Sequence, residues 1–308
     1  LLMNLGGVIG GLLVDVIRKY LEVNITYIFV LGAIAAIVSL LTAIILIKKE
    51  TQALSEDEKK ENQQKDSATS KQSAWTIFVN LIKESTFWRF IVLMTALLGV
   101  RAVFAYMYLL MPLYWTRVIE EVSTEKTNMG FLQALNPILI VVGLIIFIPL
   151  ANKFNVFKML VFGAIISSLS LIFMILPFSW FSDTMAGGYF MMSVLMLTVL
   201  SIGEVIWSPK LTEYTAAIAP KGQEGSYLGM SMMPWFVAKL SVSAASGHML
   251  ARWVPEGIGQ KIKNGEVDFW DSPEAMWFWL FVWAIIGPIL AILFSKWLTK
   301  GADLEATG

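Results

Sequence analysis

One carboxylate stands out among the residues able to do chemistry, because Glu204 lies inside 189–219, a long apolar stretch. A carboxylate at membrane depth costs about 2.5–3.5 kcal/mol even on lenient insertion scales. Such a residue is usually kept to bind a cation, to move a proton or to close a structural ion pair. The first two uses predict transport, and the third remains open as the structural alternative.

Two cations lie in other apolar runs. Arg101 is near the middle of 87–115, where it would hold a substrate carboxylate, exchange partners with Glu204, or form a fixed salt bridge between helices. Lys239 is one helical turn from Trp235, so both face the same side. Lys239 would neutralise Glu204 in the empty carrier and release it when substrate binds.

Other polar side chains are weaker candidates. Tyr106 and its neighbours Tyr108 and Tyr114 would line a cavity, although tyrosines also gather at membrane boundaries. His248, near a helix end, is predicted to be an interfacial residue and not a proton relay. A run of charges at one helix exit predicts a solvated cluster: Asp15, Arg18, Lys19 and Glu22.

Composition defines the class of protein. Of 308 residues 57% are hydrophobic and 15% charged, with the charges between apolar runs, which is typical of an all-α polytopic membrane protein embedded in a lipid bilayer. The sequence has no cysteine, one histidine and no net charge. This inventory predicts no enzyme, no metal site, no cofactor other than a coupling proton, and no nucleic-acid partner.

The elements that position these residues follow from the apolar runs, because a spanning helix needs about 20 mostly apolar residues. Charged 48–74 predicts a soluble linker, and 75–83 predicts a short interfacial segment. Eight spanning helices are expected near 1–18, 25–47, 87–115, 129–150, 157–178, 187–217, 226–251 and 275–298.

The basic loops predict the orientation. Lysines in the linker, between the fourth and fifth helices, before the seventh and after the last all fall on one side if the helices alternate. That side is predicted to be cytoplasmic, in a cell (inner or plasma) membrane. The linker and the tail at 301–308 would then both be cytoplasmic.

Two helices, a charged linker and six helices resemble the second part of a major facilitator superfamily chain. The resemblance implies that 1–47 forms the last two helices of an N-terminal bundle and 75–300 a six-helix C-terminal bundle, with the linker at 48–74 between them. The chain opens inside an apolar run without Met, so we expect residue 1 to lie inside a helix whose start is missing, and the resemblance implies about four preceding helices. The protein would function as a monomer together with those helices.

Three short segments carry a narrower resemblance. They hold Asn-Leu-Gly at 4–6, Asn-Pro at 136–137, and Gly-Glu at 203–204 followed by Ser-Pro at 208–209 and Ala-Pro at 219–220. These segments are similar to those of the proton-dependent oligopeptide transporter family. The resemblance implies that Asn4, Asn136 and Glu204 face a central cavity and receive the amino terminus of a small peptide. Helix-packing hydrogen bonds are the alternative for both asparagines.

The predicted function is therefore secondary active transport, with proton-coupled symport of small peptides by alternating access. A carrier of another small solute (amino acid, drug, sugar or organic acid) and a transport-inactive sensor of the same fold are the alternatives. We expect Asn136 and Glu204 to share a polar cavity that Arg101 or Lys239 approaches. The candidate substrate-binding residues are Asn4, Asn136, Glu204, Arg101, Lys239, Trp235 and Tyr106.

Overall fold

The computed structural model describes residues 2–21, 27–53, 82–124, 126–151, 154–219 and 224–300. These residues form helices joined by turns, with no strand among them. Most of the linker predicted at 48–74, most of the segment at 75–83 and the tail at 301–308 lie outside the described residues. The all-α fold predicted from the apolar runs is confirmed. Helices suit a bilayer because lipid offers no hydrogen bonds, so each backbone group must be bonded within its own helix.

The chain divides into two compact units, residues 16–88 and residues 1–15 with 89–308, and the domain boundaries drawn from the sequence stay predictions. The smaller unit contains the π-helical turn η1 (Val16–Tyr20) and α2 (Tyr27–Ala53). The remaining helices are α1 (Leu2–Asp15), α5 (Ser85–Ala96), α6 (Leu98–Leu109), α7 (Met111–Val118), α8 (Met129–Ala151), α9 (Val156–Leu169), α10 (Met185–Ile218), α11 (Glu224–Met230), α12 (Met233–Trp253), α13 (Ile258–Lys263), α14 (Pro273–Leu293) and α15 (Ser295–Leu298). Short 3-10 turns are η2 (Glu120–Val122), η3 (Ser170–Met174), η4 (Phe178–Trp180) and η5 (Phe269–Asp271).

Each predicted span coincides with a helix or a run of helices. Among the described residues, five helices are long and apolar enough to cross a membrane, or six if α5 and α6, bent by 43° at their junction, count as one span. Within the described part, α1 has 14 residues and falls short of the length needed. Helices therefore occupy all eight predicted places, but they do not all meet the length and hydropathy expected of a membrane span.

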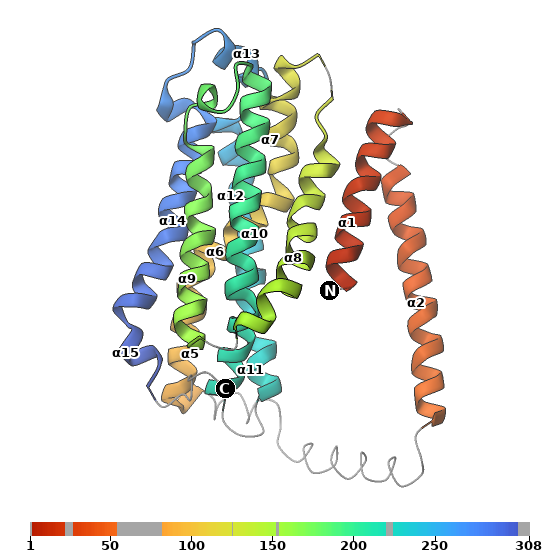
Figure 1. Cartoon of the computed structure of the whole chain (residues 1–308), viewed down its shortest axis with the longest axis vertical. Helices are drawn as coiled ribbons and strands as arrows, with labels where there is room; N and C mark the ends of the chain where they lie inside the picture. The colour runs from red at the N-terminus through yellow and green to blue at the C-terminus, as the bar shows by residue number, and fades with distance from the viewer. Residues whose placement is uncertain are drawn as a thin grey trace. The chain divides into compact units, whose positions relative to one another are not determined.

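In the larger unit, α10 packs against α8 and α9, α1 packs against α8, and α6 packs against α12 and α14 (Figure 1). Glycines bring α9 and α10 close together. A Cβ on Gly203 would lie 2.7 Å from the carbonyl oxygen of Gly163, so the two backbones touch where a larger residue would separate them. This contact sets how α10 faces its other neighbours.

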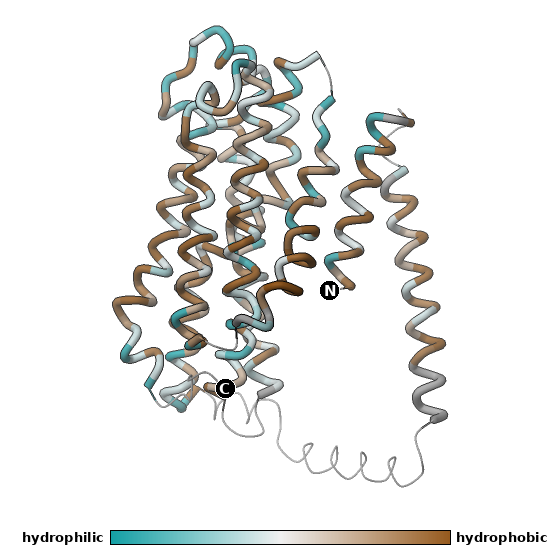
Figure 2. Tube along the Cα trace, viewed as in Figure 1, coloured by the Kyte–Doolittle hydropathy of each residue, from teal (hydrophilic) through white to brown (hydrophobic). Residues whose placement is uncertain are grey.

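The surface of these helices is apolar. Leu240 and Leu293 are 72% and 71% exposed, which is expected where side chains face hydrocarbon and not water. Figure 2 shows apolar stretches along the helices and hydrophilic residues gathered at the connections, including the loop around α13. The pattern is that of helices crossing a bilayer.

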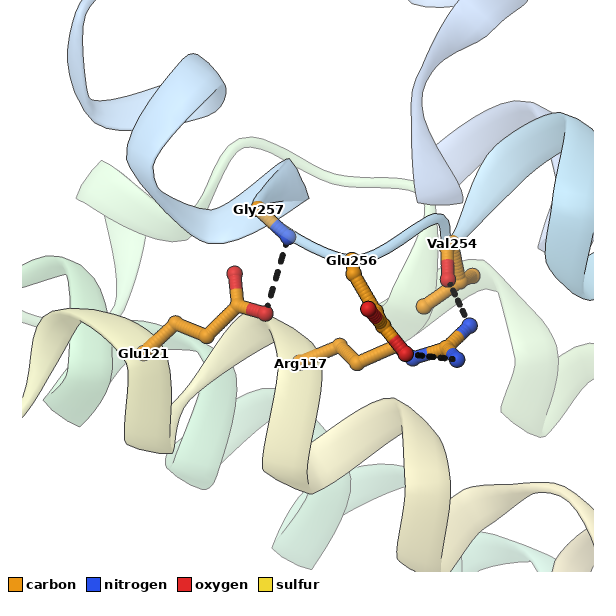
Figure 3. A network of polar contacts seen from close by, with 5 residues as sticks. All are labelled: Arg117, Glu121, Val254, Glu256 and Gly257. Atoms are coloured by element: carbon orange, nitrogen blue, oxygen red, sulfur yellow. Dashed lines mark hydrogen bonds and ion pairs between the residues drawn. The ribbon is translucent and has the colours of Figure 1, made fainter.

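A polar network holds the end of α7 against the segment that precedes α13 (Figure 3). Arg117 donates to the carbonyl oxygen of Val254 at 2.6 Å and pairs with Glu256 at 3.5 Å. The Glu121 carboxylate accepts the backbone N–H of Gly257 at 3.0 Å. Gly257 has a φ of 77°, which favours glycine, so both the residue type and the bond fix the start of α13.

The prediction of a solvated charge cluster is wrong for Asp15. Asp15 is only 9% exposed, and its two carboxylate oxygens accept the backbone N–H groups of Gly130 and Phe131, each at 2.7 Å. The first N–H groups of a helix have no partner within the helix and carry partial positive charge, so a carboxylate from α1 satisfies the start of α8.

Candidate polar site on α6, α8, α10 and α12

The centre of the site is a hydrogen-bonded group on α8 and α10. The side-chain amide of Asn136 donates to Glu204 Oε2 at 2.9 Å and to Ser201 Oγ at 3.0 Å. Asn136 is 3% exposed, so these bonds form away from solvent. The structure thus brings together two of the residues selected from the sequence.

Helix geometry explains why these side chains meet. Ser201 and Glu204 are three residues apart on α10 and share one face. Gly203 lies against α9, and its close approach to Gly163 leaves Glu204 on a different face, toward α8. Asn136 precedes Pro137, which lies inside α8.

The hydrogen bonds leave acceptor capacity unused. Both N–H groups of the Asn136 amide are taken, by Ser201 and by Glu204. Within the part of the chain that the structure describes, neither Asn136 Oδ1 nor Glu204 Oε1 accepts a hydrogen bond. Two oxygens, one of them carboxylate, are therefore available to a donor such as an ammonium group.

Arg101 lies between two indoles. Its guanidinium carbon is 5.2 Å from the ring centroid of Trp207 on α10 and 5.7 Å from that of Trp235 on α12. Arg101 and Glu204 attract each other electrostatically, yet no ion pair within 4.0 Å joins them among the described residues. The fixed salt bridge considered from the sequence is thus not formed between these two, and the aromatic rings hold the guanidinium.

Lys239 contacts the same indole, with its ammonium nitrogen 4.8 Å from the ring centroid of Trp235. The two side chains share a face of α12, as their spacing predicts. Lys239 itself is exposed, and the described contacts include none between Lys239 and Glu204. A neutralising role for Lys239 stays a prediction.

Among the described contacts, neither Asn4 nor Tyr106 joins the hydrogen-bonded group of Asn136, Ser201 and Glu204. Asn4 is half-buried on α1, one turn from Gly7, whose added Cβ would lie 3.0 Å from Pro137 of α8. Tyr106 is 2% exposed, and its hydroxyl donates to the sulfur of Met249. Tyr106 therefore takes part in the contact between α6 and α12.

Sequence reasoning missed Ser201 and Trp207. Ser201 accepts a hydrogen bond from Asn136, and Trp207 supplies one of the rings beside Arg101. Both lie three residues from Glu204, one on each side, so helical spacing alone could have selected them.

Comparison with known proteins identifies the class. The family model of the Major Facilitator Superfamily matches residues 1–242, and the chain therefore belongs to this superfamily of membrane transporters. No curated protein matches the chain. The fold expected from two helices, a linker and six helices is confirmed at the level of the superfamily.

Solved structures show the same fold. A mutant of the peptide transporter POT with alafosfalin is 15% identical with a TM-score of 0.66, covering 97% of this chain and 66% of that one. The peptide transporter POT with sulfate is 15% identical with a TM-score of 0.66, and the match covers 99% of this chain and 67% of that one. A POT family transporter with 5-aminolevulinic acid is 18% identical with a TM-score of 0.51, and the match covers 89% of this chain and 55% of that one. The chain thus spans about two thirds of the length of the first two.

Proposed function

We propose that the protein containing this chain is a secondary active transporter that carries small peptides together with protons by alternating access. The observation that carries the proposal is the Asn136–Glu204 pair inside apolar helices, where Asn136 Oδ1 and Glu204 Oε1 accept no hydrogen bond from the described residues. Membership of the superfamily supports transport, and the structural likeness to peptide transporters supports the choice of substrate.

A zwitterion fits the arrangement of charges. Its ammonium group would bind Glu204 Oε1 and Asn136 Oδ1, because a carboxylate and an amide oxygen both accept charge-assisted bonds. Its carboxylate would bind Arg101, whose guanidinium lies near the Trp207 and Trp235 rings and can donate two parallel bonds to a carboxylate. A neutral sugar would make no use of either charge.

Proton coupling would arise at the same carboxylate. Glu204 can hold a proton or an ammonium group, so the two ligands influence each other's binding. If one conformation of the carrier favours the protonated form and the other the ionised form, proton and peptide movement are linked. Rocking of the two helical bundles around the site would then expose it to each side in turn.

The test is uptake of a labelled dipeptide by the full-length protein in liposomes under an inward proton gradient. We expect Glu204→Gln to abolish or strongly reduce uptake, because the amide keeps the shape but loses the negative charge. Glu256→Gln is the matched control, since its side chain is 89% exposed and lies in the network at the end of α7. Equal uptake by Glu204→Gln and the unmodified protein would overturn the proposal.

The choice of substrate needs a second measurement. Competition by unlabelled dipeptides, amino acids, sugars, organic acids and cationic drugs should show dipeptides as the strongest competitors. If another solute competes better, the protein is still a carrier, but its substrate is that solute and not a peptide. Saturable dipeptide binding without flux would instead support a transport-inactive sensor.

A further inference from the structure

A cavity of about 600 Å³ lies between the start of α9 and the junction of α14 with α15. None of the residues around it belongs to the Asn136–Glu204 site. Its walls come from α9, α14 and α15, and α9 packs against α14 beside it, so the cavity is a groove between these helices. This groove is independent of the proposed substrate site.

One end of the groove is basic and polar. Lys158 from α9 and Lys296 from α15 line it together with the hydroxyls of Ser295 and Thr299. Within the described part of the chain neither lysine belongs to an ion pair, whereas Lys210 of α10 is paired with Glu213 at 2.7 Å. Two lysines directed at one groove without a carboxylate partner attract an anion.

The rest of the groove is apolar. Val161, Phe162 and Ile165 follow Lys158 at spacings of three, four and seven residues, so one face of α9 changes from basic to apolar over about 10 Å. Ile292 of α14 lines the opposite wall. Phe162 is 55% exposed and Ile292 50%, so apolar surface is open to an occupant here. A ligand that matches both parts has an anionic head and a hydrocarbon chain.

We propose that this groove binds one anionic phospholipid, with its phosphate between Lys158 and Lys296 and an acyl chain along Phe162 and Ile165. The basic end of the groove lies on the side that the lysine-rich loops predict to be cytoplasmic, and anionic lipids concentrate in that leaflet. The bound lipid joins α9 to α15 across the groove.

The experiment uses the full-length protein, delipidated in detergent and exposed to equal amounts of phosphatidylglycerol and phosphatidylcholine. Native mass spectrometry then measures how much of each lipid is bound. We expect phosphatidylglycerol to be preferred, and Lys158→Gln with Lys296→Gln to reduce that preference by roughly 30-fold, about fivefold for each lysine near the surface. An unchanged preference in this double variant would overturn the proposal.

Two further variants locate the effect. Lys261→Gln with Lys263→Gln removes the same charge from exposed positions on α13 and should leave the lipid preference intact. Ile165→Trp fills the apolar part and should lower binding of phosphatidylglycerol while both groove lysines remain. If the α13 variant loses the preference equally, or Ile165→Trp has no effect, the groove is not the lipid site. Displacement of the lipid by millimolar inorganic phosphate alone would also contradict a phospholipid occupant.

Discussion

Asp15 and Glu204 are two carboxylates on apolar helices, and their hydrogen bonds differ. Both oxygens of Asp15 accept backbone N–H groups at 2.7 Å, at the first turn of α8. Glu204 accepts one bond, from the amide of Asn136 at 2.9 Å, and its other oxygen is unused among the described residues. The difference teaches that hydrogen-bond saturation separates a structural carboxylate from one with capacity left for a ligand.

The charges around Asp15 and Glu204 also differ. Asp15 lies at a helix N-terminus, whose partial positive charge compensates the carboxylate. Glu204 lies inside α10 and is attracted by Arg101, which is held by Trp207 and Trp235 and not by the carboxylate itself. One charge is thus compensated by a helix N-terminus, and the other has no ion-pair partner within 4.0 Å among the described residues.

Glu204→Gln should give the largest effect on binding. Loss of a charge-assisted bond should weaken dipeptide affinity about tenfold to a hundredfold, equivalent to about 1.5–3 kcal/mol. The thermal unfolding midpoint should change little, because the amide can still accept the bond from Asn136. Titration calorimetry and a thermal melt on one preparation measure both. A large loss of stability with unchanged affinity would show that Glu204 is the structural carboxylate, contrary to the comparison with Asp15.

Asp15→Ala should give the opposite result. Two N–H groups at the start of α8 lose their acceptor, and removal of a helix cap costs about 0.5–2 kcal/mol of unfolding free energy. Denaturant unfolding in detergent measures this loss. Asp15→Asn should cost less, since its amide oxygen still accepts one bond. A tenfold loss of dipeptide affinity in Asp15→Ala with normal stability would contradict a structural role.

Arg101→Lys should weaken dipeptide binding by about fivefold, equivalent to about 1 kcal/mol. Lysine keeps the positive charge but loses the planar group that lies between Trp207 and Trp235. A dipeptide with an amidated carboxyl terminus should bind both proteins with similar affinity, because it has no carboxylate for Arg101. If Arg101→Lys weakens binding of the amidated dipeptide as much as binding of the free dipeptide, Arg101 does not receive that carboxylate.

Asn136→Ala should have the smallest effect, a loss of affinity of about twofold to fivefold. The substitution removes a neutral acceptor, which typically contributes about 0.5–1.5 kcal/mol, and water can substitute in part. Isothermal titration with the same dipeptide measures the change. An effect exceeding that of Glu204→Gln would place the main binding contact on Asn136.

Several features were predictable because they depend on local sequence. Runs of about 20 apolar residues predict spanning helices whatever lies around them, and a carboxylate inside such a run, as at Glu204, is costly in any fold. The pairing of Lys239 with Trp235 follows from helical spacing alone. For these, no knowledge of packing was needed.

The sequence by itself thus determined the membrane class, the places of the helices and the position of Glu204 inside an apolar helix. The tertiary structure alone decided which groups meet across helices, because Asn136 and Glu204 are 68 residues apart and Asp15 and Gly130 are 115 apart. Helical spacing gives the face on which a side chain lies, but not the helix it meets. That choice depends on close backbone contacts such as Gly163 with Gly203, which form only when the helices pack together.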